Sequence, residues 1–92
     1  MTRSAILTWK IEFTPASLKQ LKKAGPENGR RILSFLRSRV ATDPRAHGTL
    51  LKGALREFWR YRVGNFRILA RIEDERVLVL IVRIGHRKDV YR

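Results

Sequence analysis

Residues 58–72 of the 92-residue chain read FWRYRVGNFRILARI, and this stretch predicts a β-hairpin. Apolar residues alternate with others along it, which is the period of a half-buried strand. Gly64 and Asn65 in the middle are typical of a two-residue hairpin turn. With these residues in the turn, Arg62 lies directly opposite Arg67. One face of the hairpin is then apolar and turned to the core, and the other face is basic.

The basic face of the hairpin carries cations and no acid, because no Asp or Glu occurs between residues 58 and 72. The cations are Arg60, Arg62, Arg67 and Arg71. Solubility is served by mixed charge, and directly opposed arginines destabilise a strand pair by a few tenths to about 1 kcal/mol. We therefore interpret this face as a phosphate-binding surface. Arg83 joins it if the next connection spans residues 73–77, and lies on the core side if that connection is one residue shorter.

Periodicity and turn residues predict the other elements. They are a strand over 7–13, a helix from Pro15 to Gly25, a second helix from Pro26 to Thr42, a loop over 43–56, and a central strand over 77–84 that Gly85 breaks. The hairpin strands cover 58–63 and 66–72. This order describes one α+β domain over residues 1–92, with both helices on one face of a mainly antiparallel sheet. Alternation assigns Trp9, Trp59 and Tyr61 to the core.

The chain as a whole is strongly basic, with 21 Lys and Arg against 8 Asp and Glu and a formal net charge of +13. Such a charge predicts a polyanionic partner. The absence of cysteine excludes disulfides and cysteine-ligated zinc and favours a reducing, cytoplasmic location. His47 and His86 lack metal-ligand spacing, so a metal enzyme is not expected. The longest apolar run, residues 77–82, is too short to cross a membrane, and we expect no membrane partner.

Cleavage of RNA suits this composition, because the substrate supplies its own nucleophile in the 2′-hydroxyl. The protein needs a base for the hydroxyl proton, cations for the charge that grows on the phosphate oxygens, and an acid for the leaving 5′-oxygen. Arginines, a tyrosine and a histidine can fill these roles. A tyrosine among arginines can serve as the base, since a nearby opposite charge favours its ionised form.

Three segments, taken in order, resemble the RelE branch of the RelE/ParE toxin superfamily. They are LKG at 51–53, WRYRVGNFR at 59–67 and GHRKDVY at 85–91, and the resemblance covers about residues 6–92. It implies a RelE-like fold with the order β-α-α-β-β-β. It also implies a toxin of a type II toxin–antitoxin system, an endoribonuclease that cuts mRNA in the ribosomal A site and inhibits translation without a metal or other cofactor.

The resemblance implies a role for each of three catalytic candidates. Arg67 resembles the arginine that grips the scissile phosphate. Arg87 resembles the arginine that stabilises the transition state or acts as the acid. Tyr91 resembles the terminal tyrosine that activates the 2′-hydroxyl or stacks on the base.

Two positions depart from the pattern of the family. Arg60 and Arg62 stand where well-studied members have lysines. Arginine binds phosphate but hardly gives up a proton, so any acid role of those lysines must move to another residue. His86 is a candidate, because histidine exchanges protons near neutral pH. Arg60 and Arg62 then belong to the predicted phosphate-binding set, which Arg71, Arg83 and Lys52 complete.

Partners follow from the same resemblance. They are mRNA on the ribosome and a RelB-like antitoxin whose acidic or amphipathic segment wraps the toxin, with operator DNA contacted only through the antitoxin complex. Two other functions stay open. A ParE-like toxin would bind and inhibit DNA gyrase, although such members generally lack the set Arg67, Arg87 and Tyr91. A non-enzymatic nucleic-acid binder would need only the basic sheet face.

Overall fold

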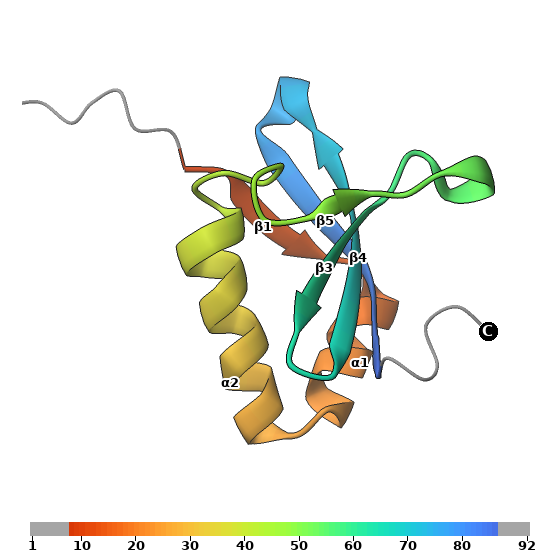
Figure 1. Ribbon diagram of the computed structural model, residues 1–92. Helices are drawn as coiled ribbons and strands as arrows, with labels where there is room; N and C mark the ends of the chain where they lie inside the picture. The colour runs from red at the N-terminus through yellow and green to blue at the C-terminus, as the bar shows by residue number, and fades with distance from the viewer. Residues whose placement is uncertain (1–7, 87–92) are drawn as a thin grey trace, which may run out of the picture.

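The computed structural model describes residues 8–86, which form two helices and a five-stranded sheet (Figure 1). In chain order these are β1 (Lys10–Phe13), α1 (Pro15–Lys23), α2 (Pro26–Phe35), β2 (Thr49–Leu50), β3 (Trp59–Val63), β4 (Phe66–Glu73) and β5 (Leu78–His86). A π-helical turn, Leu36–Val40, extends α2, and short 3-10 turns lie at Gly53–Leu55 and Asp74–Arg76. The strand order is β1-β5-β4-β3-β2, with β1 parallel to β5 and the other pairs antiparallel. The predicted α+β class and mainly antiparallel sheet are confirmed.

The local sequence accounts for both helix starts. The Thr14 side-chain oxygen accepts a hydrogen bond from the Ser17 backbone N–H at 3.1 Å, and Pro15 follows at the start of α1. Gly25, at a φ of 97°, separates the two helices, and Pro26 opens α2. Both helices therefore begin where the sequence predicts.

Both helices cover the same face of the sheet, and the main core lies between them and the strands (Figure 1). Its buried residues are Leu21 from α1, Ile32, Leu36 and Val40 from α2 and its π-helical extension, and Tyr61, Val63, Ile68, Ala70, Val79, Ile81 and Ile84 from the sheet. Trp9 and Trp59 pack against this cluster, as predicted. One side of the sheet is thus committed to packing, and the other remains available for binding.

The β3–β4 hairpin has the predicted register. Val63 pairs with Phe66, and Arg62 pairs with Arg67, around a turn at Gly64 and Asn65. Gly64 adopts a φ of 59°, which glycine tolerates without the steric cost that a Cβ would bring.

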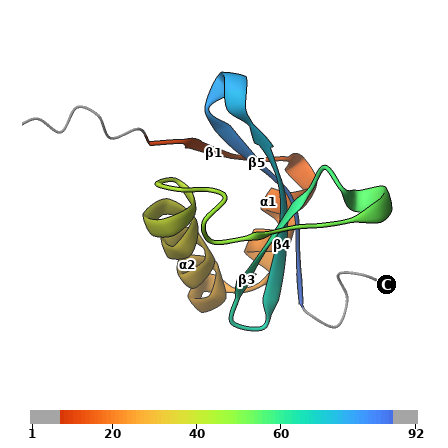
Figure 2. The same ribbon diagram turned by 45° about the horizontal axis from the view of Figure 1, so that its top comes forward.

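Two predictions about where strands begin and end are wrong. The segment 43–56, expected to be a loop, contains β2 and a 3-10 turn. Figure 2 shows the chain after β2, with this turn, extending from the sheet as an arm on the side away from α2. Gly85 does not end β5, because Gly85 and His86 still pair with Arg67 and Phe66 of β4. The longer β4 provides partners for two more residues of β5.

The position of Arg83 follows from a β-bulge. The connection between β4 and β5 spans residues 74–77, which in a regular ladder would put Arg83 on the core side. The register shifts between Leu69 and Ala70, however, so that Leu69 pairs with Arg83 and Ala70 with Ile81. Val82 is the extra residue, and every β5 residue beyond it changes face. Arg83 therefore lies on the exposed face with the hairpin arginines.

No helix within residues 8–86 is both long enough and apolar enough to cross a membrane.

Candidate phosphate-binding site

Five arginines gather on the sheet face that the helices leave uncovered. They are Arg60 and Arg62 from β3, Arg67 and Arg71 from β4, and Arg83 from β5, and we call this set the arginine face. Directly paired residues share a sheet face, and so do residues two apart on one strand. The five side chains therefore project from three neighbouring strands on one side of the sheet.

Leu69 lies at the centre of the arginine face. Its cross-strand partners are Arg60 and Arg83, and Arg67 and Arg71 lie two residues away along β4. Although Leu69 points away from the helices, only 6% of its surface is exposed. The aliphatic stems of the surrounding arginines are placed to cover it.

Arg60 shows the clearest sign of an unfilled binding position. Its Nε is buried and has no hydrogen-bond partner among the residues that the structure describes. A buried donor without an acceptor typically costs about 1–3 kcal/mol. An anion on the arginine face is one group that would satisfy it.

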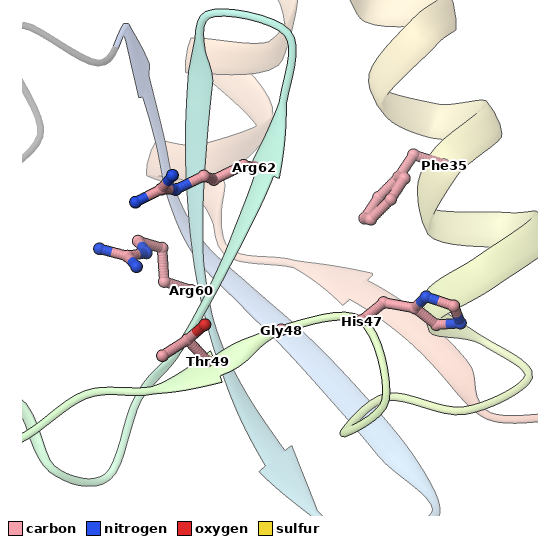
Figure 3. A pocket seen from close by; sticks show the side chains of 6 residues that line it. All are labelled: Phe35, His47, Gly48, Thr49, Arg60 and Arg62. Carbon is pink, nitrogen blue, oxygen red and sulfur yellow. The ribbon is translucent and has the colours of Figure 1, made fainter.

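Arg60 and Arg62 also border a hollow of about 400 Å³ at the edge of β3. The hollow is lined by Phe35, His47, Gly48, Thr49, Arg60 and Arg62. Figure 3 shows both guanidinium groups extending to the side of the hairpin away from Phe35, which comes from α2. This arrangement confirms that the two arginines leave the sheet on the face without helices.

The acid Glu57 lies at the rim of this surface. Glu57 Oε1 is 3.9 Å from Arg71 Nη2, and both side chains are about half exposed or more. A solvent-exposed ion pair of this kind contributes at most about 1 kcal/mol. A polyanion can therefore replace Glu57 at Arg71 at little cost.

The structure separates some predicted site residues from the arginine face. His86 pairs with Phe66 and so lies on the helix side, with its ring 5.8 Å from the Phe66 ring centroid in an edge-on arrangement. Lys52 is exposed and precedes the 3-10 turn of the arm, outside the strands that carry the arginines. Arg87 and Tyr91 lie outside the described residues.

Tyr61 is structural and does not suit the role of base. It is fully buried, and its hydroxyl donates a hydrogen bond of 2.8 Å to the Pro44 carbonyl oxygen. Burial raises the pKa of Tyr61 well above its ordinary value, and the charge of Arg45 opposes this effect only in part. Of the two tyrosines in the sequence, Tyr91 alone remains a candidate base.

The loop that receives the Tyr61 hydroxyl is held by an ion pair. Arg45 donates two hydrogen bonds to Asp74, at 2.9 and 3.0 Å, and its guanidinium lies 5.6 Å from the Trp59 ring centroid. The hydrogen bond from Arg45 lowers the pKa of Asp74, and the same bond raises the pKa of Arg45. This contact joins the loop before β2 to the β4–β5 turn.

The burial of Tyr61 predicts a pH dependence of folding. The unfolded chain ionises this phenol above pH ~10 while the folded chain keeps it neutral, so stability is present below that pH and is lost as the pH rises. Above that pH, the free energy of unfolding of the wild type should fall by up to about 1.4 kcal/mol per pH unit. Tyr61→Phe should not show this fall. Urea unfolding of both proteins between pH 9 and 11 measures this difference, and parallel pH profiles would contradict it.

The described residues provide cationic side chains for a ligand. They do not provide a cluster of metal ligands. Among residues 8–86, no three His, Cys, Asp or Glu side chains cluster closely enough to hold a metal ion. The arginine face instead provides planar donors that match phosphate oxygens. The site suits the binding of a nucleic-acid backbone.

Sequence reasoning missed two polar residues that support this site from α1. Ser17 is fully buried, and its hydroxyl donates to the Ile81 carbonyl oxygen at 2.7 Å. The Gln20 side-chain oxygen accepts from the Ile84 backbone N–H at 2.7 Å. Their signal in the sequence is weak: polar side chains at helical spacing beside the buried Leu21.

The fold and the arginine face together define a small α+β protein with one packed sheet face and one cationic sheet face. The chain belongs to the family described as the ParE toxin of the type II toxin–antitoxin system parDE, whose model matches residues 11–91. It is therefore a toxin of the RelE/ParE superfamily, as its sequence predicts.

Individual relatives agree with this assignment. The chain is 30% identical over 86 residues to Toxin RelG of Mycobacterium tuberculosis, covering 94% of this chain and 99% of that protein. The toxin–antitoxin complex RelBE2 of M. tuberculosis contains a chain with a TM-score of 0.83 and 29% identity, covering 90% of this chain and 95% of that one. The isolated E. coli RelE toxin has the same fold, with a TM-score of 0.71, 21% identity, and coverage of 85% and 83%.

Proposed function

We propose that this toxin is an endoribonuclease that cuts mRNA in the ribosomal A site without a metal ion and so inhibits translation. The observation that carries the proposal is the arginine face, where five arginines from three strands share one side of the sheet and four of them neighbour the buried Leu69. Such a surface fits a phosphodiester better than an uncharged ligand.

In the proposed reaction the 2′-oxygen attacks the adjacent phosphorus while the bond from phosphorus to the 5′-oxygen breaks. Arg67 holds the scissile phosphate, and the other arginines of the face neutralise the charge on its oxygens. Tyr91 takes the 2′-hydroxyl proton or stacks on the base. The leaving 5′-oxygen receives a proton from His86 or Arg87.

The place of His86 bears on its proposed role. Its ring lies on the helix side, but it directly follows Gly85, which pairs with Arg67. The backbone of His86 is therefore one residue from the level of Arg67, at the end of β5. The leaving group would have to reach around the strand end to meet this ring.

The proposal is tested by incubating translating ribosomes with the purified protein and mapping the new 5′ ends of the mRNA. We expect cuts within codons at the stalled A site. Intact mRNA at doses that stop translation would reject the nuclease assignment.

Inhibition of DNA gyrase is the second candidate, because the family model that spans residues 11–91 is described as a ParE toxin. A supercoiling assay separates the two functions. Inhibited supercoiling with unaffected translation would favour gyrase as the target. A non-enzymatic binder would instead keep its effect in an Arg87→Ala, Tyr91→Ala double variant.

The proposed protein partner is a RelB-like antitoxin with an acidic or amphipathic segment. Solved relatives with this fold include a RelE–RelB complex from Pyrococcus horikoshii, with a TM-score of 0.70. An acidic segment would neutralise the arginine face, and this contact would block RNA from the same surface. Operator DNA would be reached only through this antitoxin.

A further inference from the structure

One edge of β5 loses its strand partner halfway along. β1 ends at Phe13, which pairs with Ile81, so β5 continues from Val82 to His86 with no β1 residue beside it. Backbone groups on a strand edge need other hydrogen-bond partners. Helix α1 follows β1 directly and makes several contacts with β5.

Two side chains one helical turn apart on α1 supply these partners. The buried Ser17 hydroxyl donates to the Ile81 carbonyl oxygen, and the Gln20 side-chain oxygen accepts from the Ile84 N–H, both at 2.7 Å. The Thr14 backbone N–H also donates to Ile81, at 3.0 Å. α1 therefore takes over the edge of β5 where β1 stops.

The spacing of these contacts along β5 shows that they lie on both sides of the β-bulge. In a regular strand the backbone groups that face one edge recur every second residue. Val77 and Ile81 follow this rule, since their carbonyl oxygens accept from Lys10 and Thr14. Ile84 is three residues beyond Ile81, so its N–H can face the same edge only because of the bulge at Val82. Ser17 and Gln20 bind β5 on either side of that bulge.

We propose that Gln20 is a positioning residue that holds the bulged register of β5 and thereby keeps Arg83 on the arginine face. Without the acceptor at Gln20, the Ile84 N–H loses this hydrogen bond. The segment after Val82 is then free to open or to relax toward the regular register, which would turn Arg83 to the core side. The inference deepens the proposed function, because it concerns how the RNA phosphate is bound.

The test compares two replacements of similar size in the full-length protein. Gln20→Met removes the acceptor, and Gln20→Glu keeps it while adding a negative charge. The probe is a short single-stranded 2′-O-methyl RNA, which lacks the nucleophile and cannot be cut by the proposed reaction. We expect Gln20→Met to weaken binding about three- to tenfold and to speed hydrogen exchange of the Ile84 amide about tenfold or more.

The charge of the glutamate separates an effect of net charge from an effect of the hydrogen bond to Ile84. If only net charge mattered, Gln20→Glu would bind RNA more weakly than Gln20→Met. The proposal requires the reverse order, with Ile84 protected in Gln20→Glu. A weaker Gln20→Glu, or unchanged Ile84 exchange in Gln20→Met, would overturn the proposal.

A double-mutant cycle tests whether Gln20 acts through Arg83. Arg83→Ala should weaken binding about tenfold, and adding Gln20→Met should then change it less than about twofold. An equal loss in both backgrounds would mean that Gln20 does not act through Arg83. A wild type that binds the 2′-O-methyl RNA but leaves mRNA on translating ribosomes intact would refute the proposed nuclease and leave this inference standing, whereas a wild type that binds no RNA would refute both.

Discussion

Arg67→Ala should lower mRNA cleavage about 100- to 1,000-fold if the chain is the proposed nuclease. Arg67 lies opposite Arg62 and two residues before Leu69 on β4, within the arginine face. Loss of one donor that stabilises charge in a transition state typically has an effect of this size. The measurement is a primer-extension map of cellular mRNA after brief induction of wild type and variant.

The matched control for this prediction is Arg76→Ala, which removes the same charge from the β4–β5 turn. Arg76 is largely exposed and pairs only with its neighbour Glu73, at 3.0 Å, among the ion pairs of the described residues. We expect this variant to cleave within about threefold of the wild type, because exposed pairs contribute little. Near-normal cleavage by Arg67→Ala would refute its assigned role, and an equal loss in Arg76→Ala would point to net charge as the cause.

Gly48→Ala should destabilise the fold by about 2 kcal/mol, and by up to about 3 kcal/mol if the backbone does not yield. A Cβ at this position would lie 2.6 Å from Tyr61 Cε1 and 3.1 Å from the Arg60 carbonyl oxygen. The Tyr61 ring is fully buried and fixed by its hydrogen bond to Pro44, so it cannot swing away. The loss should appear in urea unfolding and as a Tm lower by roughly 10 °C.

Gly29→Ala is the control, because it makes the same chemical change at a position with room for a Cβ. Gly29 lies inside α2, where a Cβ would meet Leu21 atoms at 3.7 and 3.9 Å, which is ordinary contact. Because alanine favours a helix over glycine, we expect a gain of about 0.5–1 kcal/mol. A Gly48→Ala protein as stable as the wild type would show that the loop before β2 can move away from β3.

The hairpin and the facing of its four arginines were predictable because their arrangement is local. Alternation assigns each residue of 58–72 to a face, and a two-residue turn at Gly64 and Asn65 sets the pairing of the strands. Both helix starts are local in the same sense, since Thr14, Pro15 and Pro26 act on their immediate neighbours. The structure confirms all of these predictions.

The limits of β2 and β5 were not predictable from local patterns, because a strand extends as far as its neighbour offers partners. Thr49 and Leu50 form a strand only where Arg60 and Trp59 lie beside them. Gly85 stays within β5 because Arg67 lies opposite. Neither partner is near in sequence, so no local signal marks these ends.

Alternation and turn chemistry alone thus established that one sheet face of this protein is apolar and the other basic. Whether Arg83 belongs to the basic face depended on the three-dimensional structure. The length of the β4–β5 connection would have placed Arg83 in the core, and one extra residue at Val82 reverses that result. Ser17 and Gln20 satisfy the β5 backbone on both sides of this bulge from α1, 64 residues away in sequence. Such a contact exists only after the helix has packed against the sheet, which is why the hairpin pattern could not reveal it.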